Sequence, residues 1–280
     1  MNKFLVFQSD FGLGDAAVSA MEGVAFSVSP ELNIRHLTHQ ITPFNIFEGS
    51  YRLFQAISYW PEGTVFVSVV DPGVGSKRLS LVAKTISNQY IVTPNNGTLS
   101  HVNQFIGIDE VRVIDEAVNR LKNSELSYTF HGRDVYAYTG ARLASGIIDF
   151  EGVGPLVGNE KIEMLEMYGS VLRDDTVTGQ IDILDGIFGS LWTSVTFDDF
   201  KMLGFEFGDA ADVNIYNGNK LVYTNKVIYG RSFSDVSVGQ PIIYMNSVNH
   251  MALAINQGNF SEAYKISVGK PWTISFKKCN

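Results

Sequence analysis

The sequence is poor in cysteine and has no long apolar run, and each shortage excludes a class of protein. Cys279 is the only cysteine among 280 residues, so the chain forms neither an internal disulfide nor a zinc site built from several cysteines. No stretch approaches the ~20 apolar residues of a membrane-spanning helix, and the apolar run after Lys3 is too short for a signal peptide. We therefore expect a protein of the reducing cytoplasm without a membrane partner.

Basic residues are also scarce. Lys and Arg number 21 against 29 Asp and Glu, which gives a formal net charge of −8. Nucleic-acid binding needs a surplus or a stripe of basic residues, and neither is present, so we expect no nucleic-acid partner. Hydrophobic residues make up 45% of the chain, which is enough for a sizeable core, and the length suggests about two domains.

The first half of the chain alternates strand and helix patterns. Helices are predicted at 16–28, with Asp15 as N-cap, and at 46–59. Strands are predicted at 3–8, 33–37, 64–70, 79–83 and 89–93. Such alternation indicates a mostly parallel sheet with helices on both faces. We predict an N-terminal α/β domain over residues 1–160.

The pattern changes near Gly154-Pro155, and after Arg173 only short strands follow, separated by Gly, Asp and Asn turns. The predicted strands are 176–184, 190–195, 212–217, 221–224, 241–245 and 251–255. This pattern favours a smaller antiparallel β-barrel or sandwich. We assign it to a C-terminal domain over residues 161–280, so the fold class is α/β with an appended β domain.

Three polar segments follow predicted strands, where open parallel sheets bind ligands. Asp10 follows the first strand. Its carboxylate can accept hydrogen bonds from both hydroxyls of a ribose diol, or it can stabilise a turn or cap a helix. Asp71 and Arg78 flank a glycine-rich loop and form either a functional pair or a structural ion pair. His131 suits proton transfer near neutral pH, although a lone histidine is more often structural.

His36 and His39 raise the question of a metal. Three residues apart on a strand, their side chains are expected to point to opposite faces. No third ligand is apparent in the sequence, so we expect no metal site.

A second group of candidates lies in the predicted β domain. Asp185, Phe188 and Trp192 combine an acid with two aromatic rings around a glycine turn, which suits a flat base or simply a turn beside a β core. Asn246-Ser247 and Asn256 add polar groups near the last strands, and the same two interpretations apply.

Taken in order, seven motifs resemble one family over nearly the whole chain. The family is that of the S-adenosyl-L-methionine hydroxide adenosyltransferases, relatives of the fluorinase and chlorinase enzymes. The motifs are Ser9-Asp10-Phe11-Gly12, Thr42-Pro43-Phe44, Val70-Asp71-Pro72-Gly73-Val74-Gly75, Pro94-Asn95-Asn96-Gly97, Phe130-His131-Gly132-Arg133-Asp134, Asp185 with Phe188-Gly189, and Asn246-Ser247.

The resemblance implies a reaction in which water or hydroxide attacks C5′ of S-adenosylmethionine and gives adenosine and methionine. It places the water-activating set on Asp71, Arg78 and His131, with the choice of base left open. The halogenases carry tyrosine at the position of Asp71, so no halide chemistry is expected. The implied substrate contacts are Asp10 on the ribose diol, Phe44 against the ligand, and Asn96, Asp185, Phe188, Ser190, Trp192, Asn246, Ser247 and Asn256.

The resemblance also implies an assembly: a homotrimer with each site between subunits, S-adenosylmethionine as substrate, and no cofactor. The sequence departs from the family at Ser190 and Ser194, where relatives usually carry Asn, at Ala252 for Glu and at Asn249 for Gly. These departures keep two alternatives open. One is a protein that binds adenosine or S-adenosylmethionine without turnover, and the other is a hydrolase of another adenosyl compound.

Overall fold

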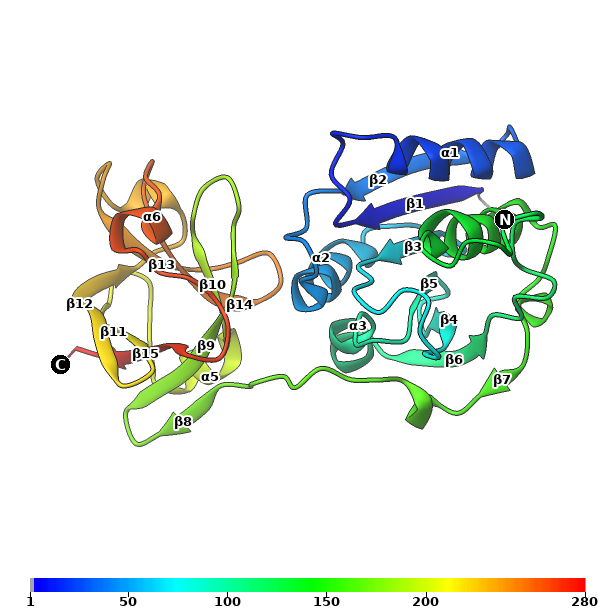
Figure 1. Ribbon diagram of the computed structural model, residues 1–280. Helices are drawn as coiled ribbons and strands as arrows, with labels where there is room; N and C mark the ends of the chain where they lie inside the picture. The colour runs from blue at the N-terminus through cyan, green and yellow to red at the C-terminus, as the bar shows by residue number, and fades with distance from the viewer. Residues whose placement is uncertain (1–2, 280) are drawn as a thin grey trace. The chain divides into compact units, whose positions relative to one another are not determined.

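The computed structural model describes residues 3–279, and the chain divides into two compact units, Met1–Leu165 and Glu166–Asn280. Each unit has its own sheet (Figure 1). The assignment of the water-activating residues to one domain and of further ligand contacts to the other stays a prediction.

The first unit is built on a seven-stranded mixed sheet in the order β2-β1-β3-β5-β4-β6-β7. Its strands are β1 (Phe4–Ser9), β2 (Asn33–Thr38), β3 (Val65–Val69), β4 (Ser80–Thr85), β5 (Tyr90–Pro94), β6 (Ile108–Val113) and β7 (Leu156–Val157). Strands β2, β1, β3 and β5 run parallel, and β4 and β7 are antiparallel to their neighbours. The prediction of a mostly parallel sheet is confirmed.

Helices cover both faces of this sheet (Figure 1). They are α1 (Ala17–Val28), α2 (Ile46–Ile57), α3 (Ser100–Phe105), the π-helix η1 (Gly132–Ala137), α4 (Tyr138–Ser145) and the 3₁₀ turns η2 (Glu151–Val153) and η3 (Asn159–Lys161). Strand β3 shows why two cores form. Val65 and Val67 pack with α1 and α4, while Phe66 packs with α2 and α3 on the opposite face, because successive strand side chains alternate.

The second unit is a closed barrel with short helices at its rim. Its elements are β8 (Val171–Arg173), β9 (Thr176–Leu184), β10 (Leu191–Thr196), α5 (Phe197–Met202), β11 (Ala210–Asn217), β12 (Lys220–Tyr229), η4 (Phe233–Asp235), β13 (Pro241–Met245), β14 (His250–Ile255), α6 (Phe260–Tyr264) and β15 (Trp272–Lys278). The strand order is β10-β14-β13-β12-β11-β15-β9-β8, and pairing of β9 with β10 closes the ring. The barrel alternative of the prediction is therefore confirmed, with one parallel pair, β12–β13.

Several elements escaped the sequence prediction, namely β6, β7, α3, α4, α5, α6, β8 and β15. The N-cap of α1 was also misplaced by one residue. The cap is Ala16, and Asp15 instead accepts the backbone N–H of Ala17 at 2.8 Å from the preceding turn.

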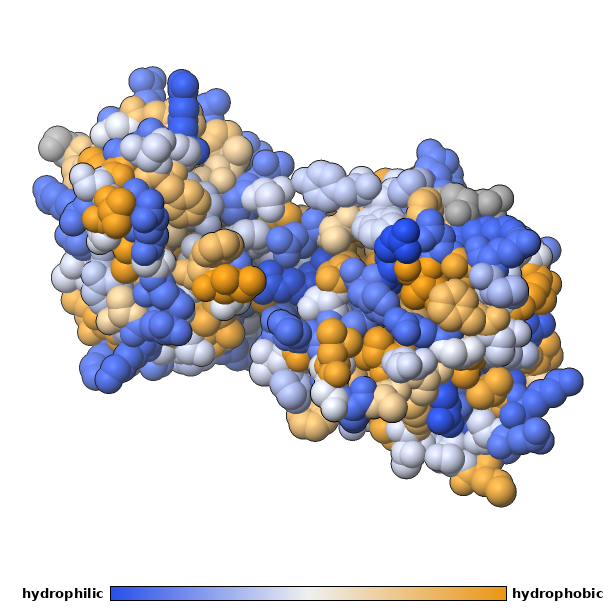
Figure 2. Space-filling view, turned by 90° about the horizontal axis from the view of Figure 1, so that it is seen from above, coloured by the Kyte–Doolittle hydropathy of each residue, from blue (hydrophilic) through white to orange (hydrophobic). Residues whose placement is uncertain are grey.

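The surface mixes apolar and hydrophilic side chains. On the face shown in Figure 2, apolar side chains form small separate groups among hydrophilic ones. Among residues 3–279, none of the helices combines the length and apolar character that crossing a bilayer requires.

Candidate functional site

The carboxyl ends of β1, β3 and β5 bring three of the predicted residues to one edge of the sheet. Strands β1 and β3 are parallel neighbours, and Ser9 pairs with Val69, so Asp10 and Asp71 leave the sheet on the same side. Asn96 follows β5, and its Nδ2 donates to the backbone oxygen of Val70 at 2.9 Å. That amide anchors the start of the Asp71 loop.

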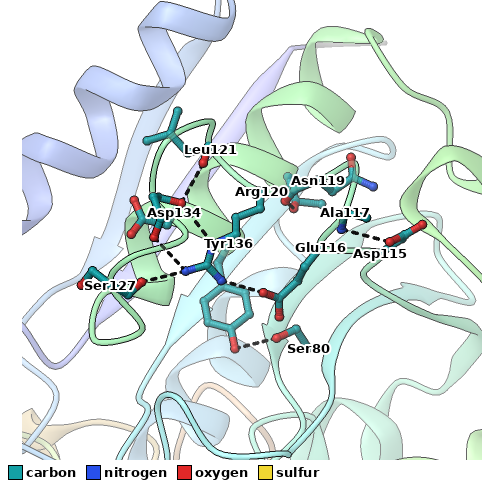
Figure 3. Close-up of polar contacts among 12 residues, drawn as sticks. Ser80, Asp115, Glu116, Ala117, Asn119, Arg120, Leu121, Ser127, Asp134 and Tyr136 are labelled. Atoms are coloured by element: carbon teal, nitrogen blue, oxygen red, sulfur yellow. Dashed lines mark hydrogen bonds and ion pairs between the residues drawn. The ribbon is translucent and has the colours of Figure 1, made fainter.

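Asp71 and Arg78 form a buried, two-pronged ion pair. Arg78 Nε donates to Asp71 Oδ1 at 2.9 Å, and Arg78 Nη2 donates to Asp71 Oδ2. The two side chains are only 5% and 13% exposed, respectively. Arg78 Nη1 also donates to the hydroxyl of Tyr136 at 2.8 Å. That hydroxyl in turn lies 3.1 Å from Ser80 Oγ (Figure 3). The guanidinium is thus fixed from two sides.

His131 joins this cluster from the segment that precedes η1. Its ring lies against Tyr136 and Tyr128, with centroid distances of 6.4 and 6.2 Å. The residue is 6% exposed, and neither ring nitrogen has a hydrogen-bond partner among residues 3–279. Buried polar atoms are rarely left without a partner, so these nitrogens are available to a water or a ligand.

Burial, rather than the surrounding charges, favours the neutral form of the His131 ring. Burial lowers the pKa of His131 below its ordinary value; Glu116 and Asp71 oppose this shift, and the nearby arginines reinforce it. Burial also raises the pKa of Asp71, against the lowering effect of Arg78 and His131. Tyr136 stays protonated, since burial raises its pKa to about 12. A neutral imidazole beside a fixed guanidinium suits a proton acceptor.

The segment before His131 is held by Arg120, which the sequence analysis missed. Arg120 Nη1 donates to Glu116 Oε2 at 2.7 Å, and Nη2 donates to the backbone oxygen of Ser127 at 2.8 Å (Figure 3). Its guanidinium also lies 4.7 Å above the ring of Tyr128. The four-residue spacing of Glu116 and Arg120 was the available signal, because such pairs meet on one side of a helical turn.

The sequence analysis also missed Tyr136. Tyr136 follows His131 by five residues, a spacing that carries no known signature.

Gly75 has φ of +78°, and a Cβ there would lie 2.9 Å from the backbone oxygen of Tyr128. Only glycine lets the 71–78 loop approach the segment that carries His131 so closely.

Asp10 faces the loop that carries Phe44. Its Oδ2 accepts the backbone N–H of Phe44 at 2.8 Å, and no hydrogen bond to Oδ1 arises within residues 3–279. Asp10 therefore does not cap α1. Phe44 has φ of +67° and a side chain that is 71% exposed, so its ring is open to a ligand.

The expected geometry of His36 and His39 is wrong. His36 Nδ1 lies 2.7 Å from His39 Nε2, so the two rings point toward each other. The reason is that β2 ends at Thr38, so strand alternation no longer applies at His39. Among residues 3–279, no group of three or more His, Cys, Asp or Glu side chains has the arrangement of a metal site.

The second unit contains a pocket of about 900 Å³. Seven predicted substrate contacts line it, namely Asp185, Phe188, Ser190, Trp192, Asn246, Ser247 and Asn256. The sequence analysis missed two further aromatic residues of the wall, Phe233 and Tyr244, whose rings lie 5.1 Å apart. An apolar pocket with a few convergent amides is typical of small-molecule sites.

Hydrogen bonds fix the polar groups of this pocket. Trp192 Nε1 donates to the hydroxyl of Tyr244 at 3.1 Å. Asn246 Oδ1 accepts the backbone N–H groups of Val248 and His250, each at 3.0 Å. Its Nδ2 is buried without a partner among residues 3–279. Because the backbone fixes the amide orientation, Asn246 has a donor left for a ligand acceptor.

The departures from the family pattern do not all touch the pocket. Ser190 lines it, whereas Ser194 Oγ accepts the backbone N–H of Gln180 at 2.9 Å, and Ala252 is fully buried in β14. Asn249 has φ of +61°, a conformation that glycine adopts freely and that asparagine tolerates best among other residues. The backbone therefore explains asparagine in place of glycine.

Comparisons with known proteins agree with this architecture. Residues 5–154 match the SAM hydroxide adenosyltransferase N-terminal domain, and residues 179–273 match its C-terminal domain. The chain is 33% identical to the (R)-S-adenosyl-L-methionine hydrolase of Methanocaldococcus jannaschii over 93% of this chain and 88% of that protein. It is 25% identical to a fluorinase of an Actinoplanes species over 98% of both chains. A conserved protein of Thermotoga maritima, known from its crystal structure, superposes with a TM-score of 0.88 at 32% identity, covering 98% of this chain and 99% of that one. The chain therefore belongs to the SAM hydroxide adenosyltransferase family.

Proposed function

We propose that the protein hydrolyses S-adenosyl-L-methionine to adenosine and L-methionine. The observation that carries the proposal is the buried imidazole of His131, which has no hydrogen-bond partner among the described residues 3–279 and lies beside the buried Asp71–Arg78 ion pair. The hydrolase of Methanocaldococcus jannaschii, at 33% identity, bears the corresponding name.

The chemistry needs an activated water more than an acid, because a sulfonium sulfur leaves readily as a thioether. The oxygen of water forms a bond to C5′ while the C5′–sulfur bond breaks and its electron pair goes to sulfur. The water proton passes to His131 or Asp71, and Arg78 supplies a fixed positive charge that favours hydroxide. Holding the water in line with C5′ supplies a further part of the rate.

In this proposal, the pocket of the second unit takes the flat adenine base. Its aromatic wall can stack the base, and the Nδ2 group of Asn246 can donate to a ring nitrogen. Asp10 would accept the ribose hydroxyls through its carboxylate. The fluorinase branch is not proposed, since Asp71 stands where halogenases carry tyrosine.

Purified protein incubated with S-adenosylmethionine tests this function, with adenosine and methionine followed by chromatography. We expect both products in equal amounts, and a loss of about 10²–10⁴-fold for His131→Ala, the usual contribution of a general base. Asp71→Asn serves as the second variant, because its side chain keeps the same shape. Adenosine at the level of the His131→Ala control would refute the proposal; tight adenosine binding without turnover would establish the non-catalytic alternative.

We also propose that the enzyme works as a homotrimer whose sites combine the N-terminal unit of one subunit with the C-terminal unit of another. Light scattering tests the assembly. Mixing inactive Asp71→Asn protein with inactive Asp185→Ala protein tests the shared site, because subunit exchange would recreate sites that are free of both substitutions. Recovered activity is expected, and a monomer or an inactive mixture would contradict this proposal.

A further inference from the structure

A hydrogen-bonded chain of four side chains runs from the surface to the end of β1, outside the cluster around His131. Glu22 Oε1 lies 2.8 Å from His36 Nε2, and His36 Nδ1 lies 2.7 Å from His39 Nε2. His39 Nδ1 then lies 2.7 Å from Ser9 Oγ. Ser9 and His39 are 0% and 4% exposed, and Ser9 immediately precedes Asp10.

The direction of the hydrogen bonds follows from the chemistry of the groups. A carboxylate only accepts, so Glu22 accepts from His36 Nε2. A neutral His39 ring has one donor and one acceptor nitrogen. Because Ser9 Oγ accepts the N–H of Phe11, we assign its hydroxyl as donor to His39 Nδ1 and His39 Nε2 as donor to His36 Nδ1. Burial, together with His36, lowers the pKa of His39 to about 4, which keeps its ring neutral at pH 7.

His39 also holds the chain on the far side of Asp10. Its backbone oxygen accepts the N–H of Gly12 at 2.7 Å, and Ser9 Oγ accepts the N–H of Phe11 at 3.3 Å. His39 therefore contacts the Ser9 side chain before Asp10 and the Gly12 backbone after it. The loop that begins at His39 continues to Phe44, whose N–H fixes Asp10 Oδ2.

We propose that His39 is the positioning residue for the Asp10 carboxylate, through its bond to Ser9, and that His36 and Glu22 orient its ring. The inference rests on the proposed function in one respect, since it takes the ligand of Asp10 to be the vicinal diol of a nucleoside. The role differs from catalysis, because none of the three residues touches the reacting atoms.

Two conservative variants separate this role from a general effect on folding. In His39→Asn, the amide reaches the place of Nδ1, so the variant keeps the hydrogen bond to Ser9 and loses the hydrogen bond to His36. In His39→Gln, the amide reaches the place of Nε2, so the variant keeps the hydrogen bond to His36 and loses the hydrogen bond to Ser9. Both variants remove the same ring from the same buried position, so packing loss alone affects them alike.

Calorimetric titration with adenosine and 2′-deoxyadenosine provides the readout, because only adenosine carries the diol. The wild type should prefer adenosine by at least about tenfold, as expected for hydrogen bonds to a charged group. Asp10→Asn should lose most of that preference. His39→Gln should reduce it at least about fivefold, whereas His39→Asn should stay within about twofold of the wild type. A wild-type preference in His39→Gln would overturn the proposal.

Amide hydrogen exchange of the ligand-free protein decides the question independently of any nucleoside. Exchange at Phe11 and Gly12 should accelerate at least about tenfold in His39→Gln and not in His39→Asn, because the opening free energy of a held segment sets its exchange rate. Equal exchange in the two variants would overturn the inference. Should S-adenosylmethionine not be hydrolysed, the proposed function fails, while these exchange rates still settle the role of His39.

Discussion

Arg78 compensates the buried carboxylate of Asp71, so replacing it by methionine isolates the electrostatic part of the site. Methionine keeps an apolar stem of similar reach and removes the guanidinium. Asp71 is 5% exposed, and removing one partner of a buried ion pair costs about 3–5 kcal/mol because the other charge is left uncompensated. In a unit of the size of Met1–Leu165, 1 kcal/mol lowers Tm by roughly 2–4 °C. We expect the transition of this unit to fall by on the order of 10 °C at pH 7.

The stability lost in Arg78→Met should depend on pH in a defined direction. Burial already raises the pKa of Asp71 from its ordinary 3.8, and Arg78 opposes that shift, so Arg78→Met raises the folded pKa further. The unfolded chain then releases the proton at lower pH than the folded chain. Stability of the variant therefore falls as pH rises from about 4 toward the raised pKa and levels off above it.

Scanning calorimetry between pH 4 and pH 8 measures this, on wild type, Arg78→Met, Asp71→Asn and the double variant. Asp71→Asn in the Arg78→Met background removes the isolated charge, so it should restore most of the lost stability at pH 7 and flatten the pH dependence. Hydrolysis should be impaired in all three variants, which separates stability from activity. Equal transition temperatures for Arg78→Met and the double variant at pH 7 would refute the electrostatic account.

Three further perturbations have definite outcomes. Burial lowers the pKa of His39 to about 4, so the unfolded chain binds a proton at this residue before the folded chain does as pH falls. Wild-type stability should therefore fall by at most about 3 kcal/mol between pH 6.5 and pH 4. In urea titrations, His39→Asn, which leaves the side chains of His36 and Glu22 unchanged, should lack this contribution to the pH dependence of stability. Asn246→Asp keeps the acceptor that holds the β13–β14 turn but removes the free Nδ2 donor, so adenosine affinity should fall about tenfold or more by calorimetry, and an unchanged affinity would contradict our assignment. Gly140→Ala should cost about 1–3 kcal/mol because its Cβ would lie 2.5 Å from Val67 Cγ2, whereas Gly23→Ala on the open face of α1 should stabilise slightly in the same thermal melts.

The elements predicted from sequence are those whose own pattern reports burial. Strand β3, Val65–Val69, is buried at every position, and four of its five residues are Val or Phe, so its pattern predicted a buried strand directly. Strand β6 reads Ile-Asp-Glu-Val-Arg-Val, with only Ile108 and Val111 buried, so its pattern resembles a surface loop. Strand β15 alternates Trp272, Ile274 and Phe276 toward the core, a period of two that the sequence analysis overlooked.

Barrel closure could not be predicted from local pattern. It depends on β10 pairing with both β9 and β14, with register shifts near Trp192 and Thr193. Strand propensity says which segments are extended but not which ones pair. The choice between sandwich and barrel was therefore a question of tertiary contacts.

The candidate site shows the same division between chemistry and context. Asp71, Arg78 and His131 carry side chains whose chemistry is explicit in the sequence, and the parallel-sheet rule brings Asp71 to the edge shared with Asp10. Tyr136 has no signature of its own. It became relevant only because the π-helix turns its hydroxyl toward Arg78 at 2.8 Å.

The two units impose different physical demands on substitution. Around His131, each contact either fixes a charge or shifts a pKa, so substituting Asp71 or Arg78 leaves a buried charge without compensation. The pocket of the second unit depends on shape and on a few neutral hydrogen bonds, so the length of a lining side chain such as Ser190 affects which ligands fit. We therefore expect substitutions in the electrostatic cluster to cost stability as well as activity, and substitutions in the aromatic pocket to change ligand affinity first.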